Sequence, residues 1–192
     1  MSIVLRPGLG VLYMKVGTHA AEPLEEIIKR KTREIEEAGF AMWGYGGNSC
    51  HPRTMVQPFA QSFAQHGGRI YLCMQEMDSK NAAAQNRADE WSADGFGWHE
   101  IPPQINVLGS RYALCIKDLH KEEFGLPLPA TRVAVGNSSG VVGSQYIRGR
   151  VDKACLEVIA DQAGAAGIEP VPISLVAELV DPYAVFLRNK AS

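Results

Sequence analysis

The segment from residue 43 to 52 carries more reactive and ligand-binding side chains than a plain turn needs. It reads Trp-Gly-Tyr-Gly-Gly-Asn-Ser-Cys-His-Pro and lies between a predicted strand and a predicted helix. Loops held by a rigid scaffold are where binding and catalytic groups concentrate. The ring of Tyr45 can stack on a planar ligand, while glycines allow a ligand to approach the backbone closely. The positions next to Tyr45 that we expect to contact a ligand are Gly46, Gly47 and Asn48.

The same segment offers a nucleophile in Cys50 and a general acid or base in His51. Adjacent residues rarely face each other, so a Cys50 thiolate would depend on the N-terminus of the following helix and on a distant imidazole, His19 or His99. Glu76 could orient the imidazole in such an enzyme. The structural alternative is that Cys50 is a packed thiol and His51 caps the helix. Because no HxH, HExxH or CxxC spacing is present, we predict no metal site, and the sequence identifies no cofactor.

A second loop, residues 136–144, is rich in glycine and serine and follows a predicted strand. A strand, such a loop and a helix together present free backbone N–H groups and a positive helix end to an anion. The alternative is an exposed flexible loop. The residues that we expect to hold a phosphate or carboxylate group are Ser138, Ser139, Gly140, Arg148 and Arg150.

The elements that must position these residues alternate between strand and helix in the first half of the chain. Period-2 and short apolar runs predict strands at 11–16, 40–45, 69–74, 112–117, 131–135, 171–175 and 183–187. Period-3.6 patterns predict helices at 23–39, 52–66, 81–91 and 145–163, and the segment 92–109 is irregular. The fold class that we predict is α/β, a single-domain mixed, partly parallel sheet flanked by helices, with one globular domain over residues 1–192.

Parallel strands would bring several polar residues to one edge of the sheet, because open parallel sheets bind ligands beyond the carboxyl ends of their strands. If the first three strands are parallel, the residues at that edge are His19, Cys50, His51, Glu76 and Asp78. The strands at 112–117 and 131–135 have no helix between them, which favours an antiparallel portion.

Composition restricts the classes of function. The chain has 192 residues, a net charge of -2 and a pI near 6.2, unlike a protein that grips duplex nucleic acid with its whole surface. Cys73, Cys115 and Cys155 lie in apolar patterns typical of reduced core thiols. No apolar run is long enough for a membrane span and no signal peptide is apparent, so we expect a soluble, cytoplasmic protein without a membrane partner. A homo-oligomer is left open.

Three functions from different classes fit these residues. The one that we favour is binding of a nucleotide or similar phosphate-bearing small molecule through the 136–144 loop and the aromatic, glycine-rich segment. The alternative is a small hydrolase or transferase that uses Cys50 or His51. A single-stranded nucleic acid binder is disfavoured by the acidic pI; its basic cluster would be Arg132, Arg148, Arg150 and Lys153.

Overall fold

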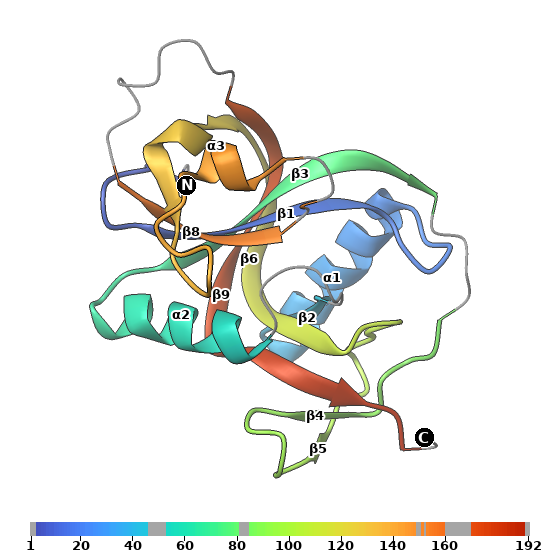
Figure 1. The fold of residues 1–192 in the computed structure, drawn as a ribbon. Coiled ribbons are helices and arrows are strands. Elements are labelled where there is room, and N and C mark those ends of the chain that lie inside the picture. Colours follow the sequence, from blue (N-terminus) through green and yellow to red (C-terminus); the bar gives the residue numbers. More distant parts are fainter. Residues whose placement is uncertain are drawn as a thin grey trace.

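A computed structural model describes residues 3–45, 53–80, 85–148, 151, 153–159 and 170–190. Its strands belong to one curved sheet in the order β2-β6-β9-β3-β1-β8-β7, with β4 and β5 attached beside β9 (Figure 1). The strands are β1 (Gly10–Thr18), β2 (Ala41–Gly44), β3 (Ile70–Lys80), β4 (Glu90–Ser92), β5 (His99–Glu100), β6 (Tyr112–Leu126), β7 (Thr131–Val133), β8 (Lys153–Val158) and β9 (Val171–Arg188). The helices are α1 (Leu24–Ala38), α2 (Arg53–Gln65), α3 (Gly143–Tyr146) and a 3-10 turn at Leu128–Ala130.

The predicted mixed, partly parallel sheet is confirmed, although few helices flank it. β1 and β3 run parallel, in register from Gly10 opposite Ile70 to Val16 opposite Glu76. The other pairings of described strands are antiparallel, and the two longest strands, β6 and β9, pair with each other.

One expectation about strand direction is wrong. β2 is not a parallel neighbour of β1 and β3, because it pairs only with β6 among the described strands and is reached from β3 through three antiparallel steps. The expected antiparallel portion is present, with β6 antiparallel to β2 and β9 and with β7 antiparallel to β8. The sequence shows where strands begin, but pairing over long separations is decided by which faces the whole chain can bury.

The core lies on both faces of the sheet. In β1, Leu12 and Val16 pack into one cluster with residues of α1 and α2, while Val11 and Tyr13 pack into another with β8. Successive residues of a strand point to opposite faces, so an uninterrupted apolar run is what a strand buried on both faces requires.

Helix α1 forms where the sequence predicted it. Leu24 and Ile27 are buried against the sheet, and the helix ends at Gly39, whose φ of 83° and N–H bond to the carbonyl of Ile35 form a left-handed cap. In the ribbon view α1 lies beside β2 and the lower part of β6 (Figure 1). The helix α2 at Arg53–Gln65 also agrees with the sequence prediction.

The predicted helix at 145–163 is wrong beyond Tyr146 wherever the structure describes it. Helix α3 ends at Tyr146, and Lys153–Val158 is strand β8. Ala154 and Leu156 are buried in one core cluster and Cys155 in the other. A short apolar run that is buried on alternating sides fits a strand, yet its sequence cannot be distinguished from a buried helix by periodicity alone.

Three further boundaries differ from the sequence predictions. The predicted helix at 81–91 is absent from its described part, where Glu90–Ser92 is strand β4 and Arg87 bridges to Leu108. The two strands predicted at 171–175 and 183–187 are one continuous strand, β9. The irregular segment 92–109 contains β5.

The described cysteines are core residues, as predicted. Cys73, Cys115 and Cys155 are buried free thiols. Burial raises the pKa of all three, that of Cys115 to about 12, so they are poor nucleophiles at neutral pH. Across the described ranges, each helix falls short of the length and apolar character that a bilayer crossing needs.

Candidate functional site

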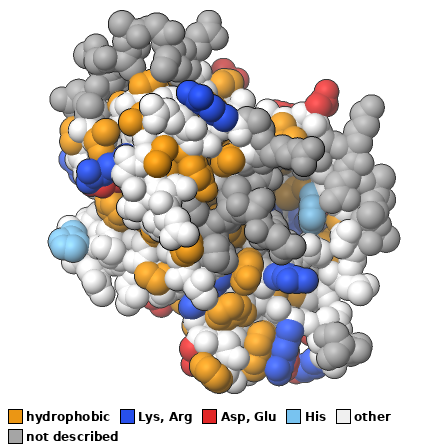
Figure 2. Space-filling view, in the orientation of Figure 1, with side chains coloured by type: hydrophobic (Ala, Val, Ile, Leu, Met, Phe, Trp, Pro, Cys, Tyr) orange, Lys and Arg blue, Asp and Glu red, His pale blue; other side chains and the backbone are white. Residues whose placement is uncertain are grey.

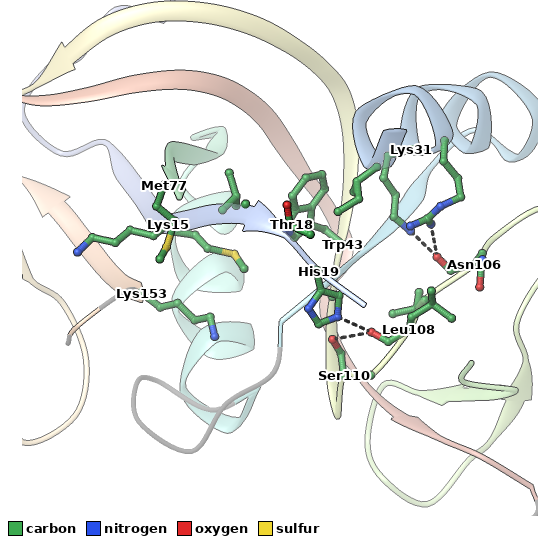
Figure 3. A pocket seen from close by; sticks show the side chains of 18 of the residues that line it. Lys15, Thr18, His19, Lys31, Trp43, Met77, Asn106, Leu108, Ser110 and Lys153 are labelled. Atoms are coloured by element: carbon green, nitrogen blue, oxygen red, sulfur yellow. Dashed lines mark hydrogen bonds between the residues drawn. The ribbon is translucent and has the colours of Figure 1, made fainter. Parts of the chain in front are cut away.

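A cavity of about 530 Å³ lies where the ends of β1 and β2 meet helix α1 and the segment 106–111 (Figure 3). This volume suits a small molecule, since ligand sites usually enclose about 300–1,000 Å³. We call it the β1–α1 pocket. Its lining residues are Met14–His19, Ile27, Arg30, Lys31, Trp43, Gly44, Met77, 106–111 and Lys153.

The β1–α1 pocket has an excess of positive charge. None of the described residues that line it is Asp or Glu. The cationic lining residues are Lys15, Arg30, Lys31, Arg111 and Lys153. On the molecular face in Figure 2, acidic side chains are sparse and lie near the margins, whereas basic ones also lie over the centre.

A buried charge cluster joins α1 to the opposite wall of the pocket. The Glu34 carboxylate accepts hydrogen bonds from Lys31 (2.8 Å), Arg30 (3.1 Å) and the backbone N–H of Asn106 (3.1 Å). The carbonyl of Asn106 in turn accepts from Arg30 (2.6 Å) and Lys31 (2.8 Å). Arg30 also donates to Glu22 at 2.5 and 3.0 Å. Both backbone polar groups of Asn106 are therefore held by α1, which fixes the start of segment 106–111.

The pKa values of Lys31 and Glu22 in this cluster are both lowered, but by different causes. Burial lowers the pKa of Lys31 to about 8, although the carboxylate of Glu34 acts in the opposite direction. The hydrogen bond from Arg30 lowers the pKa of Glu22. Lys31 and Glu34 are almost fully buried, with side chains 3% and 2% exposed, so each depends on the other for its stability in the core.

His19 lies at the end of β1 and faces the pocket. Its Nε2 atom is 2.9 Å from the carbonyl oxygen of Leu108. A carbonyl oxygen can only accept a hydrogen bond, so Nε2 of His19 is a ring nitrogen that carries a hydrogen. Figure 3 shows His19 between the lysine side and the segment that carries Leu108 and Ser110. The imidazole is thus held in one orientation by the pocket wall.

The turn that follows His19 has an unusual backbone. His19 and Glu22 exchange two backbone hydrogen bonds, and the two residues between them, Ala20 and Ala21, have φ values of 51° and 65°. Tight hairpin turns with two positive φ values normally contain Asn-Gly or Asp-Gly, because a Cβ is disfavoured there by about 1–2 kcal/mol per residue.

We expect the double variant Ala20→Asn and Ala21→Gly to raise the free energy of unfolding by about 1 kcal/mol, because both residues tolerate this backbone better than Ala. Urea unfolding measures the change. Ala38→Gly, at an ordinary helical position in α1, is the control and should lose stability instead. A loss in the turn variant would contradict a strained turn.

Gly44 is needed for contact within the protein. A Cβ at this position would lie 2.5 Å from the Oγ of Ser110, so any larger residue would push β2 and segment 106–111 apart. Close approach by a protein side chain therefore accounts for this glycine of the aromatic, glycine-rich segment.

No known family model matches the chain, and no significant similarity to a curated protein or a solved structure is found. The interpretation of the β1–α1 pocket therefore depends on its own geometry.

Most of the aromatic, glycine-rich segment lies outside the described residues. The candidate site residues affected are Gly46, Gly47, Asn48, Cys50 and His51. Trp43, which is 5% exposed, lines the β1–α1 pocket. Tyr45 is 2% exposed and belongs to the core, where its ring lies 5.2 Å from the Nζ atom of Lys153. It therefore lies in the core and not at a pocket rim.

The other sequence-predicted catalytic groups do not meet at the pocket. Glu76 is exposed on β3, opposite Val16, and is not among the lining residues. His99 stacks with Trp91 in the β4–β5 hairpin, with ring centroids 5.1 Å apart. Of the polar residues expected at one sheet edge, His19 is the one that the described structure places in the pocket.

The 136–144 loop is not part of the β1–α1 pocket lining, and the backbone N–H groups of Ser139, Gly140 and Val141 already have acceptors within the protein. Ser139 donates to the carbonyl of Gly136, and Gly140 donates to that of Val133. Ser138 is half-buried, Arg148 is exposed and donates to the carbonyl of Ser144, and Arg150 lies outside the described residues. The long helix that the predicted anion cradle required is not found among the described residues, where α3 has only four residues. The 136–144 loop does not line this cavity, whereas Trp43 and Gly44 of the aromatic, glycine-rich segment do.

The charged residues that line or support the pocket were not predicted as site residues, and Arg30 and Lys31 of α1 are among them. The signal that was available is the position of Lys31 and Glu34, which fall at the same helical spacing as Leu24 and Ile27, the buried stripe. Charges within an apolar stripe indicate a buried pair. The contributions of Lys15, Arg111 and Lys153 have no comparable local signal.

Proposed function

We propose that the protein binds a phosphate-bearing small molecule, such as a nucleotide, in the β1–α1 pocket. The observation that carries this proposal is the lining itself, which includes five cationic residues and, among the described residues, no carboxylate. A low-dielectric cleft lined by one sign of charge concentrates ligands of the opposite sign.

The charge excess remains after the internal ion pairs are considered. Glu22 and Glu34 neutralise Arg30 and Lys31. Arg111 has no carboxylate within ion-pair distance among the described residues. The Lys153 ammonium lies 5.2 Å from the centroid of the Tyr45 ring. Such groups favour a ligand that carries more than one negative charge.

The apolar part of the lining supports a ligand with a ring or hydrocarbon portion. Trp43, Val107 and Leu108 line the pocket, and the first two are buried. Small-molecule sites commonly combine an apolar wall with a few placed polar groups. The ligand class is the one that the sequence favours, but its proposed position moves from the 136–144 loop to the lysine-lined pocket.

The hydrolase or transferase alternative stays a prediction. Cys50 and His51 lie outside the described residues, and Glu76 is exposed away from the pocket. No observation at the described residues favours this alternative over binding.

Isothermal titration calorimetry with inorganic phosphate, pyrophosphate, AMP and adenosine tests the proposal. We expect saturable binding of AMP, binding of adenosine at least about tenfold weaker, and affinity for AMP that falls as salt is added, because the phosphate supplies the charged contacts. Equal affinity for AMP and adenosine, or no saturable binding of any phosphate compound by the folded protein, would refute it.

A further inference from the structure

Arg30 of α1 joins two segments at the β1–α1 pocket that are far apart in the sequence. One is the turn at residues 19–22, which follows β1, and the other is segment 106–111. The Arg30 guanidinium donates to the carboxylate of Glu22 through Nε at 3.0 Å and through a terminal nitrogen at 2.5 Å. Its other terminal nitrogen donates to the backbone carbonyl of Asn106 at 2.6 Å. One side chain therefore ties both segments to α1.

The donors of this guanidinium are largely used within the protein. A bond to the carboxylate of Glu34 at 3.1 Å brings its hydrogen bonds with described residues to four, and a guanidinium has five N–H groups. The carboxylates of Glu22 and Glu34 offset its charge. Arg30 is therefore better placed to hold the pocket wall than to bind a phosphate group itself.

The turn that Arg30 holds has an unfavourable backbone. Ala20 and Ala21 both have positive φ, at 51° and 65°, a conformation in which a Cβ is disfavoured. Such a backbone persists only where the surrounding structure over-determines it. The two parallel hydrogen bonds from Arg30 fix the side chain of Glu22, the last residue of the turn. They supply a restraint of the kind that this turn requires.

The first residue of the same turn is His19, which provides a second tie to segment 106–111. His19 and Glu22 exchange two backbone hydrogen bonds, and Nε2 of His19 donates to the carbonyl of Leu108 at 2.9 Å. Figure 3 shows both ties, from α1 to Asn106 and from His19 to Leu108. Release of Glu22 should therefore let the turn relax and draw His19 away from this wall.

We propose that Arg30 is a positioning residue of the β1–α1 pocket, which holds the strained turn 19–22 against segment 106–111 and so keeps the walls at the spacing that binds the ligand. It acts through His19 and Asn106 and not by contact with the ligand. Walls that are already ordered do not have to be ordered when the ligand binds, which favours affinity. This inference rests on the proposed function and assigns a role within it to a residue of α1.

Arg30→Lys is the first test, because lysine keeps the charge but cannot make the two parallel bonds to Glu22 and reach Asn106 at the same time. We expect AMP binding to weaken by about tenfold in calorimetry, since the walls must then be ordered on binding. Amide hydrogen exchange of the N–H groups of His19 and Glu22 should become about tenfold faster, while that of Leu12, in the middle of β1, stays unchanged.

The decisive test adds Ala20→Asn and Ala21→Gly to Arg30→Lys. A turn that is favourable by itself keeps His19 on the carbonyl of Leu108 without the restraint from Arg30. We expect this triple variant to recover AMP affinity to within about threefold of the unaltered protein. The matched control is Arg33→Lys, an exposed arginine of α1 that does not line the pocket, which should change neither affinity nor exchange.

The outcomes separate this inference from the proposed function. Unchanged AMP affinity in the folded Arg30→Lys protein would overturn the role of Arg30 and leave the pocket intact. A loss that the triple variant does not recover would also overturn it, because a contact between Arg30 and the phosphate cannot be replaced by a relaxed turn. Absence of AMP binding by the unaltered protein would overturn the proposed function, and this inference with it.

Discussion

Replacing Lys153 with methionine should weaken AMP binding by about tenfold. An ammonium that contacts a phosphate contributes about 1.5–3 kcal/mol, and about 1.4 kcal/mol corresponds to a factor of ten. Lys153 lines the β1–α1 pocket. Met keeps most of the apolar stem, so packing against Tyr45 and the sheet is largely preserved. Isothermal titration calorimetry measures the change in dissociation constant, and circular dichroism confirms that the variant is folded.

Two comparisons make this result specific. Lys29→Met removes an exposed lysine that pairs with Glu26 on α1, outside the pocket lining, and should leave the affinity within about twofold. Lys15→Met, on the opposite face of β1 from Met14 and Lys153, should also leave the affinity within about twofold. An unchanged dissociation constant in the folded Lys153→Met variant would show that the ligand is bound elsewhere.

Glu34→Ala should lower the free energy of unfolding by about 3–5 kcal/mol, because it leaves the buried Lys31 without its carboxylate. The variant also removes the acceptor that holds the backbone N–H of Asn106, so the pocket wall should loosen together with the core. Urea unfolding monitored by tryptophan fluorescence measures the loss.

The matched control is Glu26→Ala, which removes the acidic partner of an exposed pair on the same helix. It should cost less than about 1 kcal/mol, because exposed ion pairs contribute little. Similar losses in both variants would contradict a special role of the buried pair.

The pH dependence identifies the buried charge as the cause. In Glu34→Ala, Lys31 loses the carboxylate that raises its pKa, so its folded-state pKa falls below the value of about 8 in the unaltered protein. The unfolded chain, in which lysine has its ordinary value of about 10.4, then binds more protons than the folded variant, and stability rises with pH.

The loss caused by Glu34→Ala should therefore shrink as the pH rises toward about 8 and change little above it, where Lys31 releases its proton in both folded proteins. Unfolding curves recorded between about pH 5.5 and 9 measure this trend. A loss that is independent of pH would indicate missing packing as the cause in place of a stranded charge.

Local sequence patterns correctly predicted elements that bury only one face. The apolar stripe of Leu24 and Ile27 predicted α1, and Gly39 marked its end, because a left-handed cap favours glycine. The same pattern failed for Lys153–Val158, where consecutive buried residues satisfy a strand between two core clusters as well as they satisfy a helix. Periodicity distinguishes strand from helix only when one side faces water.

The candidate site was only partly accessible to sequence reasoning. His19 was expected at a functional sheet edge, and it does line the pocket. Lys153 was missed because it is distant in sequence from His19 and reaches the pocket only through the antiparallel pairing of β1 with β8, in which Met14 lies opposite Lys153. The sequence around a charged residue does not indicate which strand will pair with the strand that carries it.

The amino-acid sequence by itself determined the class of fold, the course of α1 and the burial of its cysteines, since these follow from short-range patterns of apolar and polar residues. The tertiary structure decided the direction of β2, the strand at β8 and the composition of the β1–α1 pocket. The reason is physical: a cavity is formed by residues from several elements, and which elements become neighbours depends on the burial of the whole chain and not on any one segment.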